Sequence, residues 1–217
     1  MPLPDGYVHP LAKTTIRGRK FNLAAIRHQE WVDAAAIDDD CVLEGMAGPD
    51  TETLTPTLDG ALVVGGVAVM DFARSIIVTV THASSIVACN GVITGTDIRG
   101  RPVTNTWAVT ATGTSKTSET AQTFKRVTGV TLIAAGDAST NTIKIGNGDI
   151  LGLDLVCVAP GIIEELEDGS APTAGAIVVG STAANADRFG SYDPNSALDG
   201  SLDFDLWYLV DDPQLEP

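Results

Sequence analysis

From residue 51 onward the sequence is a series of short runs rich in β-branched residues, separated by glycine, asparagine and aspartate. The strand-like runs cover residues 61–64, 67–70, 75–81, 87–94, 104–110, 124–132, 142–145, 176–179 and 203–210. In the last run, alternation places Phe204, Leu206, Tyr208 and Val210 on one face and Trp207 on the other. Short strands at regular spacing with turn residues between them are typical of all-β folds. We therefore expect an antiparallel β-sandwich or jelly-roll-like body.

Helical periodicity is absent after residue 51, which argues against a βαβ enzyme fold. Glycines at 146 and 148 and at 91 lie between β-like runs, so we interpret them as turns. Neither a dinucleotide-binding nor a P-loop glycine pattern follows any strand-like run. The sequence thus points to a chain that binds partners rather than one that catalyses a reaction or holds a cofactor.

The N-terminal part has a different character. Residues 21–37 contain the best helix-forming residues of the chain, with apolar side chains at near-helical spacing, and Asp38–Asp40 ends this segment. A short helix and an extended arm both fit the pattern. We expect residues 1–50 to form an N-terminal arm and residues 51–217 to form the β-sandwich body with an extended C-terminal part.

Charge divides the chain in the same way. The 13 Lys and Arg against 28 Asp and Glu give a net charge of −15, which disfavours binding to nucleic acid or to anionic membranes. Residues 1–30 nevertheless carry +3, and the remainder carries −18. Such a basic arm can fold back on its own acidic body or bind an acidic neighbour, for instance another copy of this chain. The candidate partner-binding residues are Arg17, Arg19, Lys20 and Arg27, with the aromatic Phe21 and Trp31.

The three cysteines, Cys41, Cys89 and Cys157, are far apart and have aliphatic neighbours. We expect them to be buried, reduced and without a metal or disulfide role, as in a protein assembled in a reducing cytoplasm. The N-terminus has neither the basic nor the apolar region of a signal peptide, and no apolar run is long enough to span a membrane.

Residues that could support catalysis or bind a cation are scattered. His82, in a serine-rich stretch, could in principle orient a serine, but no nucleophile-elbow motif accompanies it. The acidic runs at 38–40, 164–168 and 203–205 could supply paired carboxylates, and 199–205 could supply calcium ligands, although without the EF-hand order. Solvated turns and an acidic surface are the simpler interpretation, so we expect neither catalytic residues nor a metal.

Several segments of the chain share a recognisable pattern. They are residues 57–60 and 65–79, the Gly-Thr-Asp-x-x-Gly turn at 95–100, the Phe-Lys-x-Val-Thr element at 124–128, residues 143–153 and residues 190–200. This pattern resembles a β-sandwich family of tailed-bacteriophage virion proteins. The basic segment 1–30 has no counterpart in this pattern. The resemblance implies a capsid cement or decoration protein, which is a homotrimer as a rule and binds the major capsid protein on the virion.

Two other functions remain open. The chain could be a head–tail adaptor, a tail-tube subunit or a minor tail protein, since an acidic body suits a lumen that repels DNA. It could also be a carbohydrate-binding β-domain, in which Asp203 and Asp205 would act on a glycan.

Overall fold

The computed structural model describes residues 15–16, 19–20, 25–134 and 138–210 of the chain. Strands make up 57% and helix 2%, so the expected all-β, antiparallel sandwich-like fold is confirmed. The elements are, in order, β1 (Thr15–Ile16), β2 (Arg19–Lys20), β3 (Ala25–Trp31), β4 (Asp38–Ala47), β5 (Val63–Val64), β6 (Val67–Thr81), β7 (Cys89–Thr96), β8 (Pro102–Val109), β9 (Ser115–Glu119), β10 (Phe124–Ile133), the 3₁₀ turn η1 (Ala138–Thr140), β11 (Thr142–Gly152), β12 (Cys157–Glu167), β13 (Ala176–Val179), β14 (Gly190–Asp193) and β15 (Phe204–Val210).

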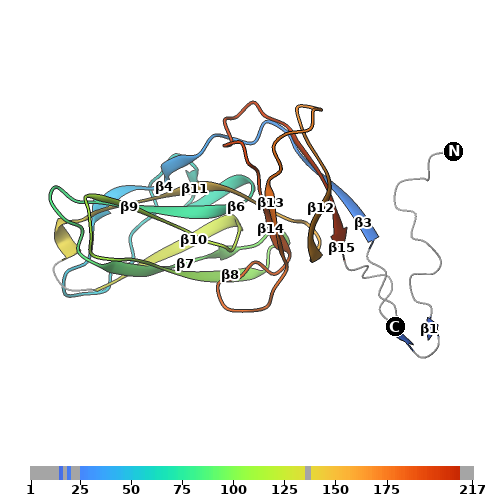
Figure 1. The fold of residues 1–217 in the computed structure, drawn as a ribbon. Coiled ribbons are helices and arrows are strands. Elements are labelled where there is room, and N and C mark those ends of the chain that lie inside the picture. The colour runs from blue at the N-terminus through green and yellow to red at the C-terminus, as the bar shows by residue number, and fades with distance from the viewer. Residues whose placement is uncertain (1–14, 17–18, 21–24, 135–137, 211–217) are drawn as a thin grey trace.

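The largest sheet has ten strands and curls over itself around β6. The first part of β6 pairs with β5 and β10, and its second part pairs with β9 and β11. From β10 the sheet continues through β7 to β8, and from β11 it continues to β4 and β14. Figure 1 shows the result as two layers, with β4, β9 and β11 above β7, β8 and β10.

Between these layers lies the larger hydrophobic core. Val78 of β6 and Ile145 of β11 belong to the same buried cluster as Ile93 of β7 and Leu132 of β10. β7 and β10 alternate buried with more exposed positions, as one-sided burial of a strand requires, whereas the second part of β6 is buried on both faces. Aliphatic side chains make up most of this core, and Trp107 and Phe124 are its large aromatic members.

A second sheet has three strands, in the order β12-β15-β3. Its inner face covers β13 and β14 and the end of β11, and it encloses a second core. This core is the aromatic part of the molecule: the rings of Trp31 and Tyr192 stack at 5.5 Å, and Tyr192 meets Phe204 edge-on at 6.4 Å. The alternation expected for 204–210 is confirmed, because Phe204, Leu206, Tyr208 and Val210 are all buried.

Three sequence-based expectations need correction. Residues 25–31 form neither a helix nor a free arm; they are strand β3, paired along its full length with β15. The arm also does not extend to residue 50, because β4 belongs to the ten-stranded sheet through β11. Finally, the glycines at 91, 146 and 148 are not turns, because Gly91 lies within β7 and β11 continues from 142 to 152. Gly146 lies close to the backbone of β4, and Gly148 lies close to the side chains of Ser75 and Glu119.

Candidate functional site

Of the six residues expected to bind a partner, Arg17 and Phe21 lie outside the described residues, and the other four lie on two strands that do not pair with each other. Arg19 and Lys20 form β2, whose partner among the described strands is β1, in a small sheet separate from the other two. Arg27 and Trp31 both belong to β3 but have structural partners within the chain.

Trp31 is a core residue, only 1% exposed, and its ring stacks on Tyr192. In this conformation it has no surface to offer a partner. Its role follows from its place in β3, where the alternation of the strand directs Trp31 and Gln29 inward. The expectation that Trp31 contacts a partner therefore does not fit this structure.

Arg27 binds the carboxylate of Asp154 with two guanidinium nitrogens, Nε at 3.3 Å and NH2 at 2.5 Å. The Tyr208 hydroxyl donates to the same carboxylate at 2.9 Å, and the Arg99 guanidinium donates to the Asp154 carbonyl. Burial and the nearby Asp154 carboxylate raise the pKa of Tyr208, so this hydroxyl stays protonated as a donor. Arg27, one member of the basic segment, therefore binds the acidic body of its own chain.

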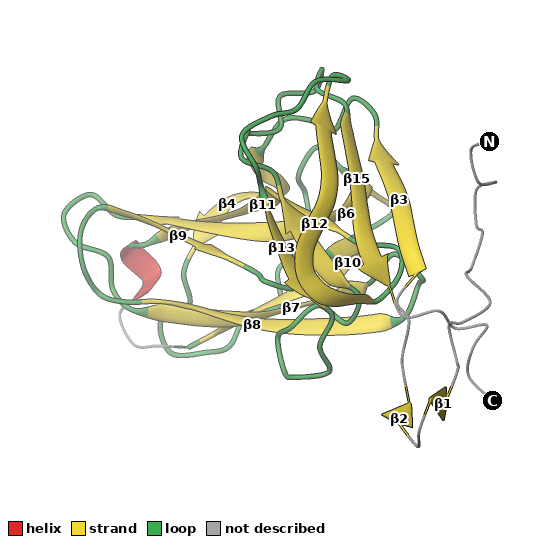
Figure 2. Ribbon diagram, turned by 45° about the vertical axis from the view of Figure 1, so that its right-hand side comes forward, coloured by secondary structure: helices red, strands yellow, loops and turns green. Residues whose placement is uncertain are grey.

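No other part of the chain that the structure describes covers the outer face of the three-stranded sheet, which is the face away from the second core (Figure 2). Cross-strand pairing defines its members: Ile26, His28 and Glu30 on β3, Leu209, Trp207 and Asp205 on β15, and Glu164 and Leu166 on β12. Ile26 is 62% exposed, Glu30 and Glu164 are exposed, and the remainder of the face is at least partly accessible. We call this set the outer face. It combines apolar area with three carboxylates and has no Lys or Arg.

The centre of the outer face is ordered by ring stacking. His28 lies on Trp207 with ring centroids 4.2 Å apart and an interplanar angle of 9°. Nε2 of His28 is 2.6 Å from Oδ1 of Asp205. These contacts cross from β3 to β15 and give the face a flat, preformed centre. Glu30 and Glu164 lie beside it, and neither forms an ion pair with another described residue.

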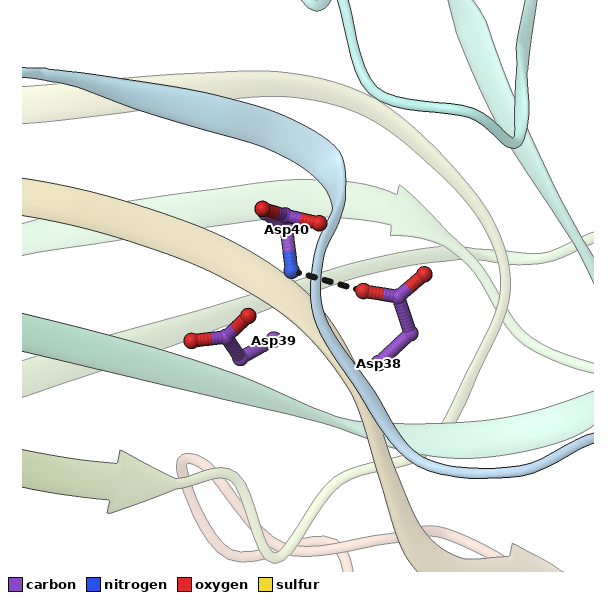
Figure 3. Close-up of side chains that lie close together, drawn as sticks. All are labelled: Asp38, Asp39 and Asp40. Atoms are coloured by element: carbon purple, nitrogen blue, oxygen red, sulfur yellow. Dashed lines mark hydrogen bonds between the residues drawn. The ribbon is translucent and has the colours of Figure 1, made fainter. Parts of the chain in front are cut away.

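Asp38–Asp40 was one of the acidic runs considered for chemistry. Carboxylate oxygens of the three residues lie within 4.8 Å of one another, and Asp38 accepts a hydrogen bond from the Asp40 backbone N–H at 3.1 Å (Figure 3). The Lys144 ammonium binds Asp40 at 2.9 Å and Asp39 at 3.3 Å. The hydrogen bond from Lys144 lowers the pKa of Asp40. The run therefore serves as the acidic side of an ion pair between β4 and β11.

The other acidic runs are likewise committed to structure. Glu165 is buried, where it accepts hydrogen bonds from the Tyr192 hydroxyl and the Gly175 N–H. Asp203 accepts the Asp33 N–H at 2.9 Å. Oδ1 of Asp199 accepts hydrogen bonds from the N–H groups of Ser201 and Leu202, and those bonds lower the pKa of Asp199. These carboxylates hold turns and strand ends.

His82 does not have the arrangement of a catalytic triad. Its Nδ1 accepts the backbone N–H groups of Ser84 at 2.9 Å and Ser85 at 2.8 Å. In a triad, the acid binds the protonated Nδ1 and the serine hydroxyl faces Nε2. Here Nδ1 is an acceptor, and the nearby hydroxyl, that of Ser84 at 3.3 Å, lies on the Nδ1 side. His82 therefore stabilises the turn after β6.

Cys41, Cys89 and Cys157 are buried, which confirms the burial expected from their aliphatic neighbours, and all three are free cysteines. Burial raises the pKa of Cys41 to about 11 and also raises the pKa values of Cys89 and Cys157. All three thiols thus stay protonated at neutral pH. Among the residues that the structure describes, no helix is long and apolar enough to cross a membrane.

The sequence reasoning missed the outer face because its acidic members, Glu30, Glu164 and Asp205, come from three distant segments. The alternation in 203–210 did place Trp207 and Asp205 on one face. The same alternation in 25–31, read as a strand, would have added His28 and Glu30. In comparisons with known proteins, no family model, no curated protein and no solved structure matches this chain.

Proposed function

We propose that this chain is a structural protein of a tailed-bacteriophage virion that binds the capsid surface as a cement or decoration protein. The observation that carries the proposal is the outer face of the β12-β15-β3 sheet, which is preformed and which no other described part of the chain covers. Glu164 and Asp205 of the acidic runs lie on this face, whereas Glu165, Asp40 and His82 are held in a buried hydrogen bond, an ion pair and a turn. The chain is thus suited to bind other subunits rather than to turn over a substrate.

The assignment to a phage head draws on the sequence resemblance at residues 57–153 and 190–200. The turn at 97–101, within that resemblance, is built as a tight corner: Asp97 accepts the backbone N–H groups of Arg99 and Arg101. Hydrogen-bonded turns of this kind fix the path of the chain between the strands of a sandwich. A rigid sandwich suits a protein that must resist the pressure of packaged DNA. The role requires extended contacts with subunits and no reaction chemistry.

Charge supports an orientation on the particle. The −18 carried by residues 31–217 is repelled by packaged DNA, so we propose that the acidic body faces away from it. The proposed partners are the major capsid protein and further copies of this chain, with a trimer as the favoured assembly. The site of action is the capsid, and assembly takes place in the host cytoplasm.

Binding to capsids tests the proposal directly. Purified full-length protein is added to heads of the source phage that were assembled without it, and the particles are imaged by cryo-electron microscopy. We expect saturable density at fixed lattice positions and a higher temperature of DNA release. Failure to bind these heads would contradict the proposal. Rings or stacked tubes formed by the protein alone would favour the tail alternative instead.

A further inference from the structure

From the separate β1–β2 hairpin and the acidic outer face we infer that the outer face binds the β1–β2 hairpin of a second copy of this chain. The inference deepens the proposed function by naming one partner, and it rests on that function only in treating the chain as an assembly protein. The contact would join neighbouring subunits through Arg19 and Lys20 of one chain and Glu30 and Glu164 of the other.

The hairpin pairs with no other strand among the residues that the structure describes. β1 and β2 pair with each other, Thr15 with Lys20 and Ile16 with Arg19, and form a sheet separate from the other two. Figure 2 draws both strands apart from the three-stranded sheet. A two-stranded hairpin of this length is at best marginally stable in water. A surface on another molecule would supply the contacts that its own body does not.

Charge complementarity identifies the surface. β2 consists of two basic residues, Arg19 and Lys20. From residue 145 onward the chain has fourteen acidic residues and Arg188 as its single basic residue, and β12 and β15 both lie in this part. The exposed Glu30 and Glu164 flank the His28–Trp207 stack, and no ion pair engages them among the described residues. The outer face is therefore a receptor for a basic segment.

Apolar contact adds to the charge. Ile26 is 62% exposed at one end of the outer face, and Ile163, beside Glu164, is 48% exposed. The hairpin contains Ile16 next to its basic residues. Burying aliphatic side chains that are exposed in the monomer would remove apolar area from water and so add to the stability of the contact.

The position of the hairpin in the chain favours a second copy over its own face. Four residues separate Lys20 from Ala25, where β3 begins. A return along β3 through the tightest hairpin turn would set Lys20 opposite Arg27, a like charge, and would keep the hairpin at the edge of the sheet opposite β12. Glu164 lies two strands further across the sheet. These limits of reach do not apply when the hairpin belongs to a second copy of the chain.

A charge exchange in the full-length chain tests the contact without any capsid. One variant reverses the hairpin (Arg19→Glu with Lys20→Glu), and another reverses the face (Glu30→Lys with Glu164→Lys). A control reverses two exposed carboxylates elsewhere (Glu44→Lys with Glu52→Lys). Sedimentation velocity gives the assembly state at several salt concentrations, and circular dichroism verifies folding.

We expect the wild type and the control to self-associate and to dissociate as salt rises. Each reversed variant should self-associate at least about tenfold more weakly, because like charges then meet at the contact. An equimolar mixture of the two reversed variants should regain association, and so should a chain that carries both reversals.

Three results would overturn the inference: a wild type that stays monomeric at low salt, reversed variants that associate like the wild type, or a mixture that does not regain association. A hairpin bound to its own face would give the first of these. Since no capsid is present, the outcome is separate from that of the capsid-binding experiment, and either proposal can fail alone.

Discussion

The hydroxyl of Tyr208 lies 2.9 Å from the carboxylate of Asp154 and donates a hydrogen bond to it. This bond joins the three-stranded sheet to the segment between β11 and β12, so it connects the second core to the larger sandwich. Gln29 strengthens the connection: its side-chain oxygen accepts the Asp154 backbone N–H at 3.0 Å, and its amide donates to the Gly152 carbonyl at 3.1 Å. The outer face is therefore held on the body by polar contacts on its inner side.

Tyr208→Phe removes only the hydroxyl and should destabilise the protein by about 1–2 kcal/mol, the usual effect of losing a buried hydrogen bond. Asp154 keeps its ion pair with Arg27, which limits the loss. Urea unfolding measures the change, and the dependence on urea concentration should stay as in the wild type. A loss of less than about 0.5 kcal/mol would show that the hydroxyl contributes little to the connection.

Arg74 joins the two parts of the molecule more strongly. The side chain is fully buried, donates from Nε and NH2 to the Gly148 carbonyl, and donates from NH1 to the Ala35 carbonyl at 2.6 Å. Arg74→Met leaves these carbonyls and the partner carboxylate of Asp71 without their donor. We expect a loss of about 3–5 kcal/mol in the free energy of unfolding.

The matched control for Arg74 is Arg126→Met, at an exposed position on β10. Its effect should stay within about 0.5 kcal/mol. Arg74→Lys is an informative intermediate, because one ammonium cannot reproduce the three guanidinium contacts. If Arg74→Lys were as stable as the wild type, the hydrogen bonds to the carbonyls would not carry the effect.

A strand could be predicted from the sequence wherever a single short segment contained both β-forming residues and a clear alternation of apolar and polar positions. Phe204, Leu206, Tyr208 and Val210 alternate strictly, and the structure buries all four. Residues 25–31 were harder, because Leu23, Ile26 and Trp31 fall near helical spacing. Their partner strand β15 lies almost at the other end of the chain, and pairing over such a separation leaves no local sequence signal.

The candidate site shows the same limit. The basic residues of the arm are easy to find in the sequence because they lie close together. The acidic outer face is not, because its residues come from the three separate strands β3, β12 and β15. Glu30 and Glu164 become neighbours of one face only through the pairing of His28 and Glu164 with Trp207. Arg27, equally conspicuous, turned out to bind Asp154 of its own body.

Alkaline pH should destabilise the fold partly through Cys41. Burial raises the pKa of this thiol to about 11, against 9.0 for an unperturbed thiol. Between about pH 9 and 11 the unfolded chain has lost the thiol proton and the folded chain retains it, so the free energy of unfolding falls as pH rises.

In Cys41→Ser the serine hydroxyl can donate to Oδ1 of Asn147, as the thiol does, but it cannot ionise in this pH range. From pH 9 to 11 the free energy of unfolding should fall less steeply in this variant than in the wild type. The difference between the two slopes against pH should correspond to about one proton. Below pH 8 the difference between the two proteins should be constant. Urea unfolding at each pH provides the measurement, and parallel curves from pH 9 to 11 would contradict the assigned role of Cys41.

The packing of β4 on β11 depends on the absence of a side chain at Gly146. A Cβ atom at this position would lie 1.7 Å from the Asp38 carbonyl oxygen and 2.6 Å from the Asp39 carbonyl carbon. Both are backbone atoms of β4, which cannot move without breaking its pairing with β11. Gly146→Ala should therefore destabilise the protein by about 3 kcal/mol or more, and it should loosen β4 specifically.

Gly161→Ala is the matched control, since a Cβ there has no neighbour within 4 Å. It should be neutral, or stabilising by about 0.5 kcal/mol, because alanine restricts the unfolded chain. Hydrogen exchange locates the effect: in Gly146→Ala the amides of Cys41–Leu43 should lose protection, while those of β15 keep it. Equal stability of the two variants, or a uniform loss of protection, would mean that the close approach of β4 to β11 does not govern this part of the fold.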